Sequence, residues 1–357
     1  MQSNKAAARC RPHPAARAVS LVHAAGDSTR DFGAKMTFSS KATTQAKSAA
    51  RGALATFLGA LCLGLVAACG GSTTQVEPFV PQRLLVFGDD TSALSQGGRK
   101  FGVNALNANG GLDCAAQPLW VQTLASVYRF EFAECNPTSI EPKAFMRAFA
   151  GARVADVAAQ VEAQVAAGGF RDKDLATVLA GTNDILELYA QYPGRSVPNL
   201  LAEARVRGER LAGVVNRLVG LGVKVIVSDL PDLGLSPYAL AQKALDPTGV
   251  NRALLITELG QAFSEQLGVK VILDGRYVGL VQAQLRFRSI GISPGSFALA
   301  NITDGICTVG LPNCTTATLL TGSDPTSFLW ADDTRLSPGG HTQLATLAID
   351  RARRNPF

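Results

Sequence analysis

The sequence predicts an α/β fold in which helices cover both faces of a parallel β-sheet. Short apolar runs suited to buried strands alternate with longer segments whose apolar residues recur at helical spacing. Parallel strands need crossover connections, so this alternation is typical of a three-layer α/β/α sandwich. Apolar residues make up 47% of the 357 residues and charged residues 17%, a composition that excludes disorder for the bulk of the chain.

Four continuous apolar runs are predicted to be strands buried on both faces: residues 83–87, 175–180, 223–228 and 269–273. The carboxyl ends of parallel strands share one edge of a sheet, and in open α/β sheets ligands bind beyond that edge. We therefore expect the functional site among the polar residues that follow the four runs. In chain order these include Asp89, Asp90, Asn183, Asp184, Asp229, Asp232 and Asp274.

Helices are predicted between the strands, where apolar residues fall on one face of each segment. They include residues 154–165, 211–218 and 254–267, and Pro338 begins a last helix. The irregular segment 96–142 and the Gly-, Thr- and Cys-rich segment 290–327 are expected to be rim loops or small excursions.

Positive charge is concentrated at the start of the chain. Of 34 Lys and Arg and 28 Asp and Glu residues, nine cations and two anions fall in residues 1–68, which leaves residues 69–357 with a balance of −1. A near-neutral body does not offer the basic surface that nucleic acids require, so we expect no nucleic-acid partner.

The uncharged segment 52–68 follows basic residues, as in a secretory signal peptide, and is shorter than the ~20 residues that span a bilayer. Its end, VAAC at residues 66–69, resembles the lipobox of bacterial lipoproteins. The resemblance implies an exported protein anchored through acyl chains on Cys69. Gly70 then favours the outer membrane, facing the periplasm or the cell surface. The alternative is an uncleaved N-terminal helix with an incidental cysteine.

The domain organisation follows from these segments. The basic start of the signal peptide begins at Met36, so we expect residues 1–35 to be a non-native or disordered extension. Residues 36–68 are then the signal peptide, 69–82 a polar tether, and 83–354 a single domain large enough to bury its own core.

Four cysteines remain in the body of the chain: Cys114, Cys135, Cys307 and Cys314. An even number in an exported chain suggests two disulfides. We predict the local pairs Cys114–Cys135 and Cys307–Cys314, because each pair flanks a stretch rich in Gly, Pro or Asn. Closing the longer loop should contribute about 3 kcal/mol. A zinc site is the alternative, but the chain has no CxxC and no histidine near these cysteines.

Short motifs stand in order along the predicted strand ends and helix starts. They read GDD at residues 88–90, AGAR at 150–153, GTND at 181–184, DLPDLG at 229–234 and DDTR at 332–335. Together they resemble the SGNH/GDSL hydrolases, a superfamily of esterases and lipases with a flavodoxin-like sheet. The resemblance covers nearly the whole predicted domain.

The resemblance implies that Asp90, Asp332 and Arg335 occupy the catalytic triad positions and that Gly151 and Asn183 occupy the oxyanion-hole positions. The family has Ser where this chain has Asp90, and His where it has Arg335. An arginine stays protonated and cannot accept a proton, and a carboxylate is a poor nucleophile toward an ester. Losing the nucleophile or the base costs such an enzyme about a millionfold in turnover.

The two substituted residues are of opposite charge, so we predict an Asp90–Arg335–Asp332 ionic network. This network either plugs a disused pocket or leaves Arg335 and Asn183 to bind an anionic or polar ligand without cleaving it. A metal site built from Asp89, Asp90 and Asp332 is a weaker alternative, because Arg335 would repel the ion.

We therefore expect a catalytically impaired pseudo-esterase, anchored to the membrane, that binds an acyl, glycan or other envelope ligand and uses no cofactor. The alternative is an active ester hydrolase with rearranged residues, in which Ser92 is the nucleophile and His341 the base. A dinucleotide-binding oxidoreductase is not supported, because no G-x-G-x-x-G follows the first predicted strand.

Overall fold

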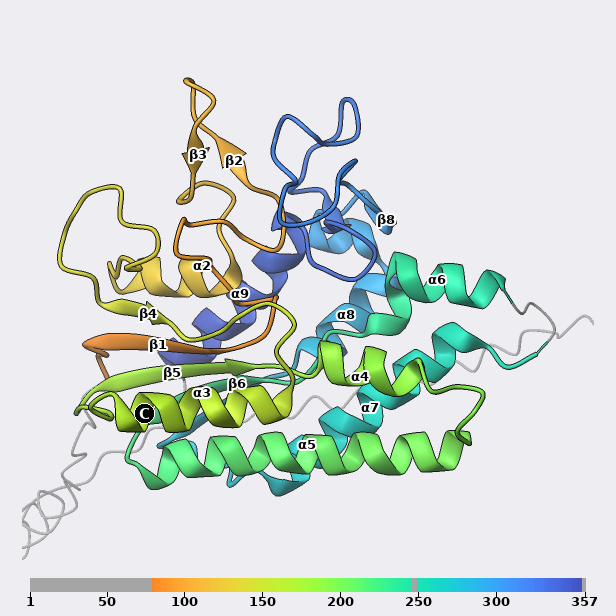
Figure 1. Ribbon diagram of the computed structural model, residues 1–357, viewed down its shortest axis with the longest axis horizontal. Helices are drawn as coiled ribbons and strands as arrows, with labels where there is room; N and C mark the ends of the chain where they lie inside the picture. Colours follow the sequence, from red (N-terminus) through yellow and green to blue (C-terminus); the bar gives the residue numbers. More distant parts are fainter. Residues whose placement is uncertain (1–78, 246–248, 355–357) are drawn as a thin grey trace, which may run out of the picture. The chain divides into compact units, whose positions relative to one another are not determined.

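The computed structural model describes residues 79–245 and 249–354, which all belong to one compact unit, Thr74–Phe357 (Figure 1). Its centre is a parallel sheet of five strands in the order β4-β1-β5-β6-β7. Counted along the chain, these five strands lie in the order 2-1-3-4-5, which is the flavodoxin-like order. The predicted three-layer α/β/α fold with a flavodoxin-like sheet is confirmed.

The strands of the main sheet are short, and two smaller sheets accompany it. The main sheet contains β1 (Arg83–Gly88), β4 (Ala144–Met146), β5 (Asp174–Leu179), β6 (Lys224–Ser228) and β7 (Val278–Val281). The smaller sheets pair β2 (Ala105–Leu106) with β3 (Leu112–Asp113), and β8 (Asn301–Gly305) with β9 (Phe328–Trp330).

Helices lie on both faces of the main sheet, and every predicted helix is present. They are α2 (Trp120–Val127), α3 (Val154–Ala166), α4 (Thr182–Tyr189), α5 (Val197–Gly220), α6 (Pro237–Ala244), α7 (Arg252–Lys270), α8 (Ala283–Ile292) and α9 (Pro338–Arg354). Single 3₁₀ turns lie at Leu233–Leu235 and Pro294–Phe297. None of the helices in the described ranges is both long and apolar enough to cross a membrane.

Strand β1 shows how the sheet joins the two helical layers. Leu85 and Phe87 belong to the cluster formed with α3, α4, α5 and α7, whereas Leu84 and Val86 belong to the cluster formed with α2, α8 and α9. Successive side chains of a strand point to opposite faces, so a strand buried on both sides needs a continuous apolar run.

The fourth predicted strand is wrong. Residues 269–273 are not a strand, because α7 continues to Lys270, and of the apolar residues after it Val271 is buried whereas Ile272 and Leu273 are largely exposed. The strand that pairs with β6 is β7, a few residues further along the chain. Asp274 therefore precedes a strand and lies at the amino edge of the sheet, where its carboxylate pairs with Arg276, 2.7 Å away. A short apolar run does not distinguish a helix end from a strand.

Both predicted disulfides are present. Cys114 pairs with Cys135 and Cys307 with Cys314, each with a Cα–Cα distance of 5.7 Å. The first lies in segment 96–142, which also contains β2, β3 and α2, and the second lies in segment 290–327 beside β8. The extension, the signal peptide, Cys69 and most of the tether lie outside the described residues.

Replacing Gly208 by Ala should destabilise the fold, because α5 and α7 touch at this glycine. An added Cβ would lie 2.1 Å from the backbone oxygen of Phe263. We expect Gly208→Ala to lower the free energy of unfolding by about 1–3 kcal/mol through overpacking. Urea denaturation followed by circular dichroism measures this change.

Gly213 is the matched control on the same helix, since an added Cβ there meets no atom within 4 Å. Gly213→Ala should raise the free energy of unfolding by up to about 1 kcal/mol through helix propensity. Equal effects of the two substitutions would contradict the close contact between α5 and α7.

Candidate functional site

The candidate site lies where β1 and β5 end side by side. Strand order reverses between these two neighbours, which is where flavodoxin-like sheets bind ligands. Gly88 at the end of β1 has φ +150°, and an added Cβ would lie 2.2 Å from the backbone oxygen of Leu179, so only glycine fits. The Gln160 side chain on α3 bonds both backbone groups of Gly88, at 2.9 Å each. The strand end that leads to Asp90 is thereby held in place.

The carboxylate of Asp90 binds both predicted oxyanion donors. Its Oδ2 accepts hydrogen bonds from the backbone N–H of Gly151 at 3.0 Å and from Nδ2 of Asn183 at 2.7 Å. In an esterase, such donors stabilise the negative oxygen that develops on the reacting carbonyl. Here a resident anion of the chain takes that place. The Asn183 amide also donates to the backbone oxygen of Ala152, and binding of an external ligand by Asn183 stays a prediction.

Asp184 positions the two donors relative to each other. Its Oδ2 accepts from the backbone N–H of Val154 at 3.0 Å, which joins the first turn of α4 to the first turn of α3. Arg207 of α5 donates to the backbone oxygen of Asp184 at 3.2 Å. Sequence reasoning placed Asp184 at a strand end but did not assign this positioning role, which depends on contacts between three helices.

Arg335 lies against Asp90, as predicted. Its Nη2 is 3.3 Å from Asp90 Oδ1, a single contact rather than a two-bond fork. Nη1 of Arg335 instead donates to the Oγ1 of Thr334 at 2.6 Å. The side chains of Arg335 and Asp90 are 24% and 6% exposed, so the ion pair is only partly screened by water.

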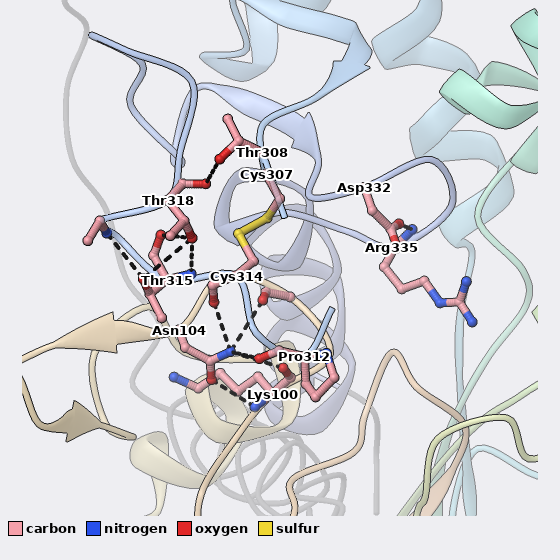
Figure 2. Close-up of a disulfide and its surroundings, with 12 residues drawn as sticks. Lys100, Asn104, Cys307, Thr308, Pro312, Cys314, Thr315, Thr318, Asp332 and Arg335 are labelled. Carbon is pink, nitrogen blue, oxygen red and sulfur yellow. Dashed lines mark hydrogen bonds between the residues drawn. A yellow bond between two sulfur atoms is a disulfide. The ribbon is translucent and has the colours of Figure 1, made fainter. Parts of the chain in front are cut away.

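The predicted third member of the network is wrong. Oδ1 of Asp332 accepts from the backbone N–H groups of Thr334 and Arg335, at 2.8 and 2.6 Å, and makes no contact with the guanidinium. Figure 2 shows the Arg335 side chain extending away from the Asp332 carboxylate. An aspartate readily bonds to N–H groups two or three residues ahead, so the local turn competes with the ion pair for this carboxylate.

The Cys307–Cys314 disulfide lies beside the turn that carries Arg335 (Figure 2). The backbone N–H of Cys307 donates to the oxygen of Ala331, whose own N–H donates to the oxygen of Arg335, at 2.9 and 2.7 Å. The buried amide of Asn104 donates to the backbone oxygens of Pro312 and Cys314. The disulfide loop is thus bonded to the turn on one side and to segment 96–142 on the other.

Asp89, next to Asp90, is fully buried. Its Oδ1 accepts from the backbone N–H of Thr91 at 3.0 Å, whereas its Oδ2 has no partner among the described residues. Burial, together with the charge of Asp90, raises the pKa of Asp89 to about 7. In the described ranges, no group of three or more His, Cys, Asp and Glu residues is placed to hold a metal ion.

The other predicted strand-end carboxylates have structural partners. Oδ1 of Asp229 accepts from the backbone N–H of Gln284 at 2.9 Å, and burial raises its pKa to about 7. Asp232 accepts from the backbone N–H of Gly234 and from the Thr257 hydroxyl, at 3.0 and 2.7 Å. Both carboxylates hold the chain that follows β6.

Ser92 and His341 do not form a couple. The buried hydroxyl of Ser92 accepts from Nε1 of Trp120 at 3.1 Å. The buried His341 ring has no hydrogen-bond partner for either nitrogen within the described ranges. Burial, together with the charge of buried Lys100, lowers the pKa of His341 to about 3. No bond joins the imidazole to the Ser92 hydroxyl.

Comparison with known proteins gives likenesses only among solved structures: no family model matches the chain, and no curated protein matches it. The acetyl xylan esterase Axe2 from Geobacillus stearothermophilus is 15% identical over 77% of this chain and 96% of its own, with a TM-score of 0.39. A lipolytic G-D-S-L family protein from Veillonella parvula is 12% identical over 75% and 96%, with a TM-score of 0.37. The lipase Lip_vut3 from a goat rumen metagenome is 11% identical over 77% and 99%, with a TM-score of 0.47.

At such low identity these likenesses concern the fold alone and carry no argument about activity. The strand order and the positions of the sequence blocks are observed in this structure and do not depend on the comparison with solved structures. The GDD, AGAR, GTND and DDTR blocks all meet around Asp90 at the carboxyl edge of the sheet. The chain thus has a flavodoxin-like α/β fold, in which the blocks that resemble those of the SGNH/GDSL hydrolases meet at one edge of the sheet.

Replacing His341 by Leu should make the fold less sensitive to acid. The imidazole is held neutral in the fold, whereas in the unfolded chain its pKa is about 6.5, so its contribution to stability is lost as pH falls from 6.5 toward 3. Between pH 7 and pH 4, the wild type should lose about 3 kcal/mol more than His341→Leu.

Urea denaturation at the two pH values measures both proteins. All other titrating groups are common to them, so the difference isolates the imidazole. Parallel losses of stability would contradict the buried, neutral state of this ring.

Proposed function

We propose that this protein is a lipid-anchored pseudo-esterase of the cell envelope, which binds an acyl, glycan or other envelope ligand without hydrolysing it. One observation carries the proposal: the Asp90 carboxylate takes up both predicted oxyanion donors and contacts the guanidinium of Arg335. The nucleophile, the base and the oxyanion hole of the family mechanism are therefore all unavailable at once.

Each loss has a separate chemical reason. Attack by a hydroxyl needs a neighbouring base whose pKa lies near the working pH, and Arg335 stays protonated. Attack by the Asp90 carboxylate on an ester would form an anhydride and would first break its contacts with Gly151 and Asn183. A carbonyl oxygen approaching these donors meets a negative charge already bound there, so its developing charge is repelled.

Binding without cleavage remains open to the side chains around this centre. The Arg335 side chain is 24% exposed and that of Arg153, two residues after Gly151, is 49% exposed. Phe149, two residues before Gly151, is 48% exposed. Guanidinium groups and an exposed aromatic ring suit the polar and apolar faces of an acylated sugar. These contacts require no movement of Asp90 and no cleavage of an ester bond in the ligand.

The wild type should not accelerate hydrolysis of p-nitrophenyl acetate, whereas the double variant Asp90→Ser with Arg335→His should gain activity. The double change restores a hydroxyl nucleophile and an imidazole base, and it frees the donors of Gly151 and Asn183. A further Asn183→Ala change should lower the gained rate by about 10²–10³, because one oxyanion donor is lost. Release of p-nitrophenol measures the wild type, the double variant and the triple variant.

The single variants are the controls, since each restores only one of the two missing groups. A folded double variant without activity would defeat the claim that these two residues block catalysis. Wild-type turnover that disappears in Ser92→Ala or His341→Ala would instead establish a rearranged hydrolase.

The anchor is tested separately, by lipid incorporation in a bacterial host. We expect the full chain to take up labelled palmitate and Cys69→Ala to take up none, since the acyl chains attach at that sulfur. Cys62→Ala is the matched control within the signal peptide and should keep the label. Equal labelling of both variants would remove Cys69 as the site of attachment.

A further inference from the structure

The amino edge of the sheet, opposite the candidate site, receives the last residues of the tether. In Figure 1, β1 and β5 begin at the left of the view, far from α4 at the carboxyl ends. The ring of Phe79 lies 5.2 Å from Nζ of Lys224 at the start of β6. The backbone N–H of Gln82 donates to the oxygen of Lys173 at 2.8 Å. The first described residues therefore lie along this edge.

Four exposed aliphatic side chains lie on segments that reach the same edge, and we call them the apolar rim. They are Val80, Val269, Ile272 and Leu273, which are 63%, 74%, 60% and 54% exposed. Single exposed aliphatic residues are ordinary, but a group of four at one edge indicates a surface for a partner.

Side-chain and backbone contacts hold the segments around the apolar rim in place. Nζ of Lys224, against the Phe79 ring, also lies 4.9 Å from the ring of Tyr277 and donates to the backbone oxygen of Arg276. The Asn216 side chain bonds the backbone of Lys270 and Ile272, at 3.0 and 2.9 Å. The segment from the end of α7 to β7 is thus a fixed surface beside the entry of the chain.

Basic side chains accompany the apolar rim. The last turn of α9 carries Arg351, Arg353 and Arg354, and exposed Lys173 precedes β5. Lys173 and Arg353 make no salt bridge with any described carboxylate. Exposed aliphatic groups with basic neighbours are what an anionic bilayer surface attracts.

The length of the tether brings a bilayer within reach. Cys69 lies ten residues before Phe79, and ten residues span at most about 36 Å when fully extended. Acyl chains on Cys69 would therefore keep the amino edge within that distance of the membrane. No other edge of the sheet is so closely tied to the proposed anchor.

We propose that the apolar rim rests on the bilayer surface and that the candidate site consequently faces away from it. The proposal rests on the lipid anchor put forward above. It assigns the four aliphatic side chains to the headgroup region and the neighbouring basic groups to anionic lipids. The attached protein then holds one orientation, with Asp90 and Arg335 directed toward ligands that are not in its own membrane leaflet.

Two tryptophan variants of the full, lipidated protein test this orientation. Ile272→Trp places the probe on the apolar rim. Ile292→Trp places it on an 86% exposed position of α8, where neighbouring Gly291 approaches Leu235 at the carboxyl edge. The native Trp120 and Trp330 are buried, so the added emission reports the new positions. Each protein is reconstituted into phosphatidylethanolamine and phosphatidylglycerol vesicles, with and without bromine on the acyl chains.

We expect brominated lipid to remove most of the added emission of Ile272→Trp and to leave that of Ile292→Trp unchanged. Retention on the vesicles without quenching of Ile272→Trp would overturn the docking proposal and leave the anchor intact. Equal quenching of both variants would likewise overturn the fixed orientation. Loss of the protein from the vesicles would overturn the anchor and the docking proposal together. A concentration-dependent change in the emission of Ile272→Trp without vesicles would assign the apolar rim to a second copy of the chain.

Discussion

The architecture of the candidate site depends on one buried carboxylate. Asp90 brings together the end of β1, the loop before α3, the first turn of α4 and the turn before α9. A buried carboxylate costs several kcal/mol unless hydrogen bonds and an opposite charge offset it, and Asp90 has both. The same donors that stabilise a transient oxyanion in an esterase therefore stabilise a permanent anion here.

Asp89, the residue before Asp90, is a buried carboxylate without the hydrogen-bond donors that Asp90 has. Asp89 and Asp90 are adjacent and both buried, yet Asp89 has one oxygen without a partner among the described residues and a pKa raised to about 7. Burial favours its neutral form, and the negative charge of Asp90 adds to that preference. Two adjacent buried carboxylates thus differ in their partners: Asp90 has two hydrogen-bond donors and a guanidinium beside it, whereas Asp89 has one donor.

The parallel sheet separates two tasks. Its carboxyl edge carries Asp90 and Arg335, and its amino edge carries the entry of the chain and the apolar rim. Because every strand of the main sheet runs in the same direction, all amino ends lie at one edge and all carboxyl ends at the other, so the two surfaces are separate. In the proposed arrangement, attachment at the amino edge is by itself sufficient to direct the candidate site away from the membrane.

The sequence by itself determined most of the local elements and the residue types at positions 90 and 335, which provide neither a hydroxyl nor an imidazole. The apolar runs predicted β1, β5 and β6, cysteine spacing predicted both disulfides, and the residue types at positions 90 and 335 exclude the family mechanism in any fold. The tertiary structure alone decided that α7 continues to Lys270 in place of a strand over residues 269–273, that Asp332 bonds to its own turn, and that Asp90 binds its donors. The segments that meet at Asp90 are 61, 93 and 245 residues away from it. Periodicity and side-chain type act within a segment, whereas such contacts exist only once packing has set distant segments side by side.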